Sequence, residues 1–364
     1  MTVRDLAACI EILAHPALQE DYDNSGLIIG SPDTSVNAAL ITLDVTERVI
    51  DEAVRKGAGM IISHHPPVFN GLKRLTGRDV TERIVFKAIR ENIALYAIHT
   101  NLDNSVNGIN RAIGEKLGLA GLTILEPVKR RLMKLVFFVP PSHARIVCQA
   151  VFDAGAGTIG NYDWCSFSVD GQGSFRAGEG AKPFTGNVNV LHHENEQRIE
   201  VILPAFLQQS VIHALIKAHP YEEPAFDLYP IENQWTNAGS GMIGELAVAI
   251  PENQLLNTIK SLFGCKCLRH TDLLNRPVKK IAVCGGSGSF LIPAAIARGA
   301  DAFITADIRY HQYFEADRRI LLIDAGHYET EQFVKELLYN HIIKKFPNFA
   351  LHLSEINTNP INYY

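Results

Sequence analysis

The segment AVRKGAGMIIS at residues 53–63 decides the fold class, because it contains the end of an amphipathic helix, a glycine turn and a short apolar strand. Glycine often follows the last turn of a helix, and a short apolar run after it is typical of a buried strand. A second segment, AIARGADAFIT at residues 295–305, aligns with the first without gaps. The alignment predicts two related halves, although two unrelated helix, glycine and strand units would give the same pattern.

Short apolar runs alternate with amphipathic stretches around both segments. Around the first we expect strands near 26–30, 39–45, 60–63 and 94–98, with helices near 46–57, 79–92 and 107–118. Around the second we expect strands near 281–284, 302–305, 320–323 and 350–353, with helices near 289–299 and 329–345. This alternation predicts an α/β fold in which βαβ units build the sheets.

The pattern changes between residues 129 and 238. The order here is a strand near 134–139, a helix near 143–155, several strands over 162–204, a helix near 206–219 and a strand near 225–231. This order predicts a ferredoxin-like α+β insert domain, with its ends marked by Pro127 and by the stretch 233–241. We therefore expect a discontinuous α/β domain of residues 1–128 and 239–364, interrupted by an insert domain of residues 129–238.

The composition is that of a globular protein without a bulk positive field. The 364 residues are 47% hydrophobic and 20% charged, and 34 Lys and Arg against 39 Asp and Glu give a net charge of −5. We therefore do not expect nucleic acid as a partner. Charge or glycine interrupts the apolar stretches before the roughly 18 residues of a membrane span, and the first residues are amphipathic. We therefore expect no membrane partner and a cytoplasmic location. The six cysteines form no CxxC pair, so the sequence does not indicate a zinc ribbon.

Two histidines follow the predicted strand at 60–63, in the motif SHHPP at residues 63–67. Neutral imidazoles at a strand end are suitable ligands for a divalent metal. A histidine pair alone is weak evidence, because His192 and His193 form a second pair beside the polar run at 194–196. We interpret that second pair as part of a solvated turn, and His64 and His65 as candidate metal ligands.

Two further motifs follow predicted strands. HTNLDN at residues 99–104 offers His99 and Asp103, and Asp103 could bridge two cations or cap the next helix. DAGHYETE at residues 324–331 places His327 and Glu331 one helical turn apart, where they could share a metal or form a surface pair.

These motifs together supply three imidazoles and two carboxylates at the ends of three predicted strands. The five residues are His64, His65, Asp103, His327 and Glu331. Five protein ligands exceed what one metal needs and suit two cations about 3.5–4 Å apart, an arrangement that lowers the pKa of a shared water. Mixed histidine and carboxylate ligands accept Zn, Fe, Mn, Co or Ni, and affinity alone does not choose among them.

Two other segments border the same predicted crevice. TADIRYH at residues 305–311 contains Asp307 and His311, which could act as general acid or base, orient a ligand histidine, or simply begin a helix. The glycine-rich CGGSGS at residues 284–289 joins a strand to a helix and could bind phosphate or form a tight turn.

Five segments resemble the family of GTP cyclohydrolase 1 type 2 homologues, also called the Nif-three-like dinuclear metal proteins. They are DNSGL at 23–27, SHHPP at 63–67, HTNLD at 99–103, CGGSG at 284–288 and GHYETE at 326–331. The resemblance implies that two divalent ions per subunit, zinc foremost, are held by the five residues named above. From these motifs we expect a metal-dependent hydrolase acting on a nucleotide or other phosphorylated small molecule, with His99, Asp307 or His311 moving protons. A noncatalytic metal-binding or regulatory assembly is the alternative.

The insert, with HPYEEP at residues 219–224, resembles the PII-like or CutA-like domain of the longer bacterial members of that family. Such domains tend to form trimers. The resemblance therefore implies a homohexamer, either a dimer of trimers or a trimer of dimers, with an insert that senses a small molecule.

Overall fold

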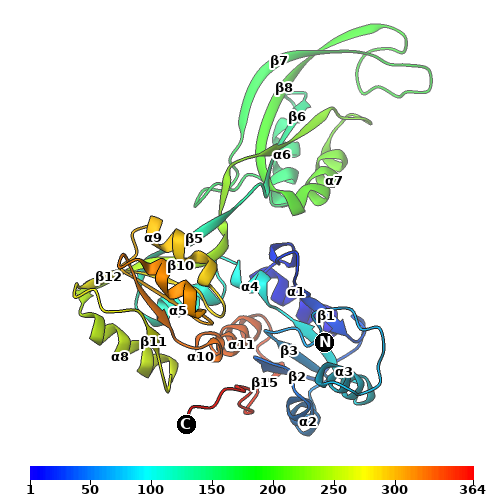
Figure 1. Cartoon of the computed structure of the whole chain (residues 1–364). Coiled ribbons are helices and arrows are strands. Elements are labelled where there is room, and N and C mark those ends of the chain that lie inside the picture. The colour runs from blue at the N-terminus through cyan, green and yellow to red at the C-terminus, as the bar shows by residue number, and fades with distance from the viewer. The chain divides into compact units, whose positions relative to one another are not determined.

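The computed structural model describes all 364 residues, which separate into two compact units (Figure 1). The outer unit contains Met1–Glu126 and Asn237–Tyr364, and the insert unit contains Pro127–Thr236. From the sequence we expect these boundaries near 128 and 239. The mixed α/β class is confirmed, with three sheets in the chain. No helix is both long and apolar enough to cross a membrane.

The first sheet of the outer unit combines four strands of the N-terminal half with the last strand of the chain. Its order is β1 (Gly26–Ile29), β4 (Ala94–Ala97), β3 (Met60–Ser63), β2 (Ala38–Thr42) and β15 (Ala350–Leu353). The last four run parallel, and β1 is antiparallel to β4. Helices α2 (Glu47–Arg55) and α3 (Val80–Arg90) cover one face, and α1 (Val3–Leu13) and α11 (Val334–Lys345) cover the other. Burial on both faces explains why its strands are continuous apolar runs.

The second sheet of the outer unit has six strands. Its order is β11 (Arg269–His270), β14 (Leu321–Asp324), β13 (Ala302–Thr305), β12 (Val278–Val283), β10 (Gln234–Ile250) and β5 (Ala120–Lys129). The central β12, β13 and β14 are parallel, and antiparallel β10 and β11 flank them. Helices α5 (Ile109–Lys116) and α8 (Glu252–Phe263) pack on one face, and α9 (Ile292–Ala297) packs on the other.

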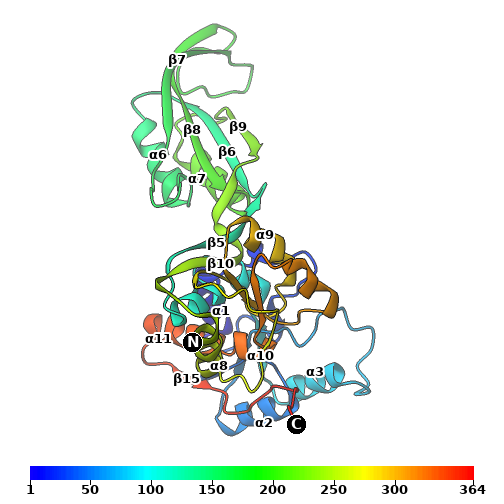
Figure 2. The same ribbon diagram turned by 60° about the vertical axis from the view of Figure 1, so that its left-hand side comes forward.

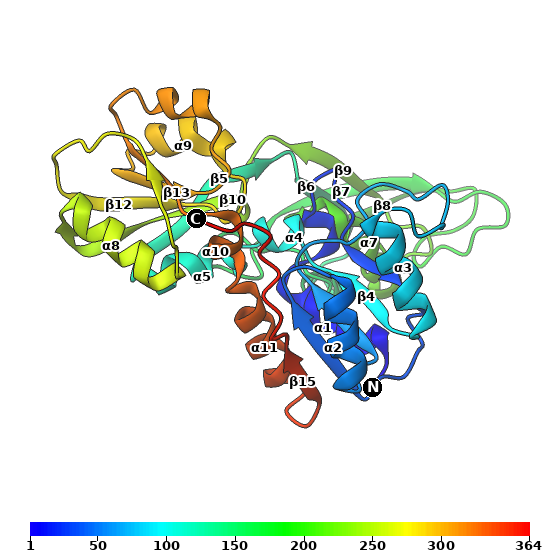
Figure 3. The same cartoon turned by 60° about the horizontal axis from the view of Figure 1, so that its bottom comes forward.

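The two halves of the outer unit share one hydrophobic core. A single cluster of buried residues contains Ile62 and Leu102 from the N-terminal half and Ile281 and Ile323 from the C-terminal half. Figure 3 shows both sheets, with α10 (His327–Glu331) and α11 between them. The carboxyl ends of strands from both halves therefore meet within one folded body, as in other open α/β sheets that bind ligands at such ends.

The internal repeat has the same secondary structure in both copies. Residues 53–63 form the end of α2 and then β3, and residues 295–305 form the end of α9 and then β13. Gly57 and Gly299 connect helix to strand with φ angles of 66° and 70°, in the left-handed region that glycine adopts without strain.

The stretch 233–241, expected to mark the end of the insert, contains the boundary between the two units at residues 236 and 237, and it is extended as part of β10. Two other local predictions are wrong. His192 and His193 lie within β8 (Leu191–Pro204) and not in a turn. The single helix expected near 329–345 is two helices, α10 and α11, separated at Gln332 and Phe333.

The insert unit is an antiparallel sheet with two helices in βαββαβ order (Figure 2). Its elements are β6 (Leu132–Val139), α6 (Ala144–Asp153), β7 (Phe167–Arg176), β8, α7 (Gln208–Ala218) and β9 (Phe226–Ile231). The strand order is β7-β8-β6-β9, which is the ferredoxin-like arrangement. Phe137 and Val201 of the sheet and Val147, Val211 and Leu215 of the helices form a core of its own.

Candidate metal centre

The structure brings the five candidate metal ligands together in the outer unit. His65 Nε2 and His327 Nε2 lie 2.9 and 3.0 Å from Glu331 Oε2, and 3.3 Å from each other. His64 Nε2 lies 3.6 Å from Asp103 Oδ1 and 3.8 Å from Glu331 Oε1. Residues that are far apart in the sequence therefore point their ligand atoms at one small volume.

Local backbone structure explains how the tandem histidines reach this position. His64 and His65 follow β3, and both backbone amides donate to the carbonyl of Leu43, which extends the pairing of β2 with β3 beyond the strand ends. His327 and Glu331 face the same way because they are four residues apart on α10. Gly326, with a φ of 89°, makes the turn into that helix.

Each of four histidines near the centre has its Nδ1 occupied by an acceptor. The pairs are His64 with the carbonyl of Ile98 at 2.7 Å, His65 with Asp44 at 2.7 Å, His99 with Asp23 at 2.8 Å, and His327 with Asp307 at 2.7 Å. A histidine that donates Nδ1–H in this way has Nε2 free as an electron-pair donor, and metal-ligating histidines are commonly fixed like this.

Three ligand atoms of the cluster are buried without a hydrogen-bond partner. They are His64 Nε2, Asp103 Oδ1 and Glu331 Oε2. An unsatisfied buried polar atom costs about 1–3 kcal/mol, so three in one place demand an explanation. Imidazole nitrogen and carboxylate oxygen are ligands of divalent transition metals. The residues present therefore fit a metal site.

The acidic members of the cluster have pKa values shifted in opposite directions. Burial and the negative charge of Glu331 raise the pKa of Asp103 well above its usual range. Burial also works against ionisation of Glu331, but three surrounding histidines outweigh it and hold the pKa of Glu331 well below its usual value. Burial lowers the pKa of His64. In the metal-free cluster, ionisation is therefore favoured at Glu331 and disfavoured at Asp103.

The other two histidines are more basic than usual. Burial works against their protonation, but the hydrogen bond to Asp44 and the negative charge of Glu331 raise the pKa of His65 to about 9. The hydrogen bond to Asp307 and the negative charge of Glu331 likewise raise the pKa of His327 to about 11. In the absence of a cation the cluster holds protons, and a divalent cation would displace them on binding.

Two overlapping groups in the cluster have ligand atoms close enough to share a metal. Within each group the ligand atoms lie within 4.8 Å of one another. The first group is His64, His65 and His99, and the second is His65, His327 and Glu331. The ring of His99 lies 5.3 and 5.4 Å from the rings of His64 and His65. The structure thus places His99, considered from its sequence as a proton carrier, at the edge of the centre.

Asp307 and His311 have different surroundings. Asp307 Oδ2 accepts hydrogen bonds from Ser287 Oγ at 2.5 Å and His327 Nδ1 at 2.7 Å, so it orients a candidate ligand. Its φ of 52° is unusual for a residue with a side chain. His311 is exposed on the 3₁₀ helix η4 (Tyr310–Ala316), where its ring contacts Tyr310 at 5.2 Å, and the structure does not bring it into the cluster.

The glycine-rich loop after β12 makes room for the cluster, and three of its amides donate to side chains of the protein. Gly285, Gly286 and Gly288 donate to Asn110, Thr330 and Thr305 side chains. A Cβ at Gly286 would lie 2.1 Å from Glu331 Oε1. These bonds are what a tight turn requires, and they leave fewer amides of the loop for a phosphate.

Two carboxylates that orient histidines carried no role in the sequence analysis. Asp44 lies just after β2, and Asp23 belongs to the DNSGL segment. Asp23 also accepts hydrogen bonds from Ser25 Oγ and from the amide and hydroxyl of Thr100. Burial opposes ionisation of Asp23, but His99 and Thr100 outweigh it and hold its pKa below the usual value. Asp44 follows a strand, as the candidate ligands do, and this position was the feature of the sequence that could have identified it.

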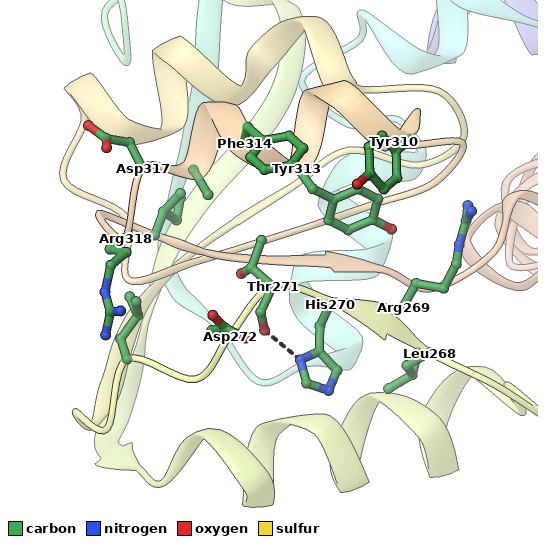
Figure 4. A pocket seen from close by; sticks show the side chains of 13 residues that line it. Leu268, Arg269, His270, Thr271, Asp272, Tyr310, Tyr313, Phe314, Asp317 and Arg318 are labelled. Atoms are coloured by element: carbon green, nitrogen blue, oxygen red, sulfur yellow. Dashed lines mark hydrogen bonds between the residues drawn. The ribbon is translucent and has the colours of Figure 1, made fainter.

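A hollow of about 840 Å³ lies in the same unit, between residues 268–274 and η4. Figure 4 shows the rings of Tyr310, Tyr313 and Phe314 along one side and Arg269 at one end. Arg269 pairs with buried Asp324, whose Oδ2 also accepts from the amide of Ile308, next to Asp307. The hollow therefore borders the loop that orients His327.

The fold and this cluster define a protein with a two-sheet α/β unit that carries a histidine and carboxylate centre suited to divalent cations. Residues 1–360 match the Duf34/NIF3 (NGG1p interacting factor 3) family, and the chain belongs to this family.

Curated relatives cover nearly the whole chain. The chain is 37% identical over 352 residues to the GTP cyclohydrolase 1 type 2 homolog of Halalkalibacterium halodurans, with 95% of each protein covered. It is 37% identical over 348 residues to the protein of the same name from Bacillus subtilis, covering 94% of the chain and 93% of that protein.

Solved structures agree with the fold. A Bacillus cereus protein related to NIF3 superposes with a TM-score of 0.87 at 37% identity, covering 100% of this chain and 99% of that one. The Staphylococcus aureus protein SA1388 superposes with a TM-score of 0.79 at 29% identity, with the same coverage.

Proposed function

We propose that the protein binds two divalent cations through His64, His65, Asp103, His327 and Glu331, and that it hydrolyses a nucleotide or another phosphorylated small molecule. The observation that carries the proposal is the convergence of three buried ligand atoms that have no hydrogen-bond partner. Zinc, iron, manganese, cobalt and nickel all suit this ligand set. The curated name of the relatives, GTP cyclohydrolase 1 type 2 homolog, supports a nucleotide as substrate.

A pair of bound cations would supply Lewis acidity and lower the pKa of a nearby water. The protein's own residues would control the protons. Hydrolysis removes a proton from water and delivers one to the leaving group, and we assign this proton transfer to His99. Asp23 holds His99 Nδ1 at 2.8 Å, so the opposite nitrogen of the ring is free to accept a proton. Asp44 and Asp307 keep His65 and His327 in fixed orientations.

The second candidate function is a noncatalytic metal-binding assembly in which the insert unit senses a small molecule. The observation that favours it is the separate core of the insert unit, which supports a second, independent binding module. In this proposal the ferredoxin-like insert acts as a PII-like or CutA-like module and the chain forms a homohexamer. Native mass spectrometry with and without a chelator tests the assembly.

One experiment separates the two functions. Metal content per subunit is measured by inductively coupled plasma mass spectrometry after reconstitution with each candidate metal, and the loaded protein is assayed against a panel of nucleotides and sugar phosphates. We expect two ions per subunit in the wild type. Asp103→Ala should lose metal and turnover while remaining folded. Asp33→Ala, which removes a carboxylate 78% exposed in the same unit, is the matched control.

Two outcomes would decide against the hydrolase. Turnover that survives Asp103→Ala at reduced metal content contradicts the role of the centre. No turnover across the panel, together with a change of assembly on chelation, supports the noncatalytic function instead.

A further inference from the structure

We propose that the insert unit binds a linear aliphatic polyamine in a cavity of its own, independently of the metal centre. The cavity has a volume of about 410 Å³ and is lined only by residues of the insert unit. We call it the insert cavity. Its size falls in the range of about 300–1,000 Å³ typical of small-molecule sites. None of the candidate metal ligands lines it.

Aromatic rings form much of the wall of the insert cavity. They belong to Phe138, Phe175, Phe184 and Tyr221. The ring of Tyr221 lies 6.0 Å from that of Phe184 and 6.4 Å from that of Phe175, with interplanar angles of 43° and 54°. Aromatic faces attract a cation within about 6 Å and also pack against methylene groups. This wall therefore suits a ligand that is both cationic and aliphatic.

The charged side chains that line the insert cavity are all acidic. They are Glu196, Glu222 and Glu223, and neither Lys nor Arg lines it. Glu196 lies over Gly173 of β7, where a Cβ would come within 2.3 Å of Glu196 Oε2. His219, which belongs to the HPYEEP motif, adds no positive charge, because burial lowers its pKa. An anionic ligand would meet only repulsion here.

The walls of the cavity are held in place by hydrogen bonds. The amide of Asn189 donates to the carbonyl of Ala177 at 2.8 Å and closes the loop between β7 and β8. The amide of Lys182, in the same loop, donates to Glu222 Oε1 at 2.9 Å. His219 Nε2 donates to the carbonyl of Phe138 at 2.9 Å. A site that is formed before the ligand arrives loses less conformational entropy on binding.

A polyamine matches these features better than other cations. A metal ion needs several oxygen ligands around it and gains nothing from an aromatic wall. A single quaternary ammonium group would satisfy the rings but leave carboxylates without a partner. A chain of methylenes with several protonated nitrogens can place its charges at the carboxylates and its methylenes on the rings.

The test is isothermal titration calorimetry of spermidine into the full-length protein at physiological salt. We expect one site per chain. Glu196→Gln should weaken binding at least about tenfold, because it removes one charged partner of the ligand. Gly173→Ala keeps every charge but displaces the Glu196 carboxylate, and should weaken binding as well. Glu232→Gln, at a carboxylate 78% exposed outside the cavity, should bind as the wild type does.

Several results would overturn the proposal. The first is that spermidine does not bind, and the second is that Glu232→Gln weakens its binding as much as Glu196→Gln does. The third is that 1,8-octanediol, which has a similar length but no charge, binds as tightly as spermidine. The proposal also fails if magnesium chloride displaces spermidine more than sodium chloride does at equal ionic strength, because the site would then be a metal site. Thermal unfolding checks that each variant is folded. If Gly173→Ala is unfolded, the affinity of Glu196→Gln for spermidine alone decides the test.

Discussion

Thr358 donates a hydrogen bond of 2.6 Å from its hydroxyl to Asp44 Oδ2. The other oxygen of the same carboxylate lies 2.7 Å from His65 Nδ1. A residue near the C-terminus therefore fixes the carboxylate that orients a candidate metal ligand near the N-terminus. Partners of this kind influence metal affinity without touching the metal.

Thr358→Val removes this hydroxyl with little change in size. Because Asp44 then loses one of its anchors and orients His65 less firmly, we expect the affinity for a cation held by His65 to fall about tenfold. Competition with a chelator, followed by mass spectrometric metal analysis, measures the change. Thr258→Val is the control, since that hydroxyl bonds only to the carbonyl of Gln254 within α8. Equal retention of metal in both variants would contradict the role of Thr358.

Gly286→Ala should disrupt the centre through Glu331. The added Cβ would lie 2.1 Å from Glu331 Oε1, and the residue has a φ of 60°. Gly299→Ala is a matched control, because Gly299 has a φ of 70° but a Cβ there meets open space. Both substitutions introduce backbone strain of about 1–2 kcal/mol.

We expect both glycine variants to unfold at lower temperature, and Gly286→Ala alone to lose metal. The two readouts are differential scanning calorimetry and metal content per subunit. If Gly299→Ala loses as much metal as Gly286→Ala, backbone strain and not the crowding of Glu331 accounts for the loss.

The five clustered residues could be predicted because their signals are local. His64 and His65 directly follow an apolar strand, and His327 and Glu331 are separated by one helical turn, so a short window of sequence contains each pair. The parallel strands of both halves were predictable for the same reason. That the pairs meet follows from α/β topology, in which the carboxyl ends of strands gather at one edge.

Contacts between distant residues could not be predicted from short windows. Asp44 and Thr358 are 314 residues apart, and the sequence around one residue gives no indication that it contacts the other. The long strand β10 was missed because its Gly239, Ser240 and Gly241 are typical of a turn. The break between α10 and α11 was missed because the two residues that separate them, Gln332 and Phe333, include neither glycine nor proline.

Asp103→Asn should separate stability from metal binding. Burial and the nearby charge of Glu331 raise the pKa of Asp103, which means that its ionised form is unfavourable in the metal-free protein. Asparagine has the same shape without the charge. We therefore expect the metal-free variant to be at least as stable as the metal-free wild type near pH 7, and its metal affinity to fall.

Urea unfolding of both proteins after chelation, together with metal titration, measures the two effects of Asp103→Asn. A loss of metal-free stability would show that the charge of Asp103 is favourable in the folded protein. Unchanged metal affinity would remove Asp103 from the set of ligands.

Glu52 should make the outer unit sensitive to acid. It is 1% exposed, and it accepts hydrogen bonds from Ser354 Oγ at 2.6 Å and from the amide of Glu355 at 2.9 Å. Burial acts to raise the pKa of Glu52, but these hydrogen bonds and Lys56 outweigh it and lower that pKa. The folded state therefore binds the Glu52 proton less tightly than the unfolded state does.

The sign of the pH dependence follows from this difference. A depressed pKa in the folded state contributes stability that is fully present above the unfolded pKa of about 4.3 and is lost as the pH falls through the folded value. Glu52→Gln removes that contribution, so we expect the wild type to be more stable at pH 6 and the difference to shrink below about pH 4. Urea unfolding at a series of pH values measures it. Glu47→Gln is the control, because that carboxylate is 44% exposed and pairs with Arg83 on the surface. A difference between Glu52→Gln and wild type that is constant from pH 6 to about pH 3 would show that Glu52 contributes through packing and not through its charge.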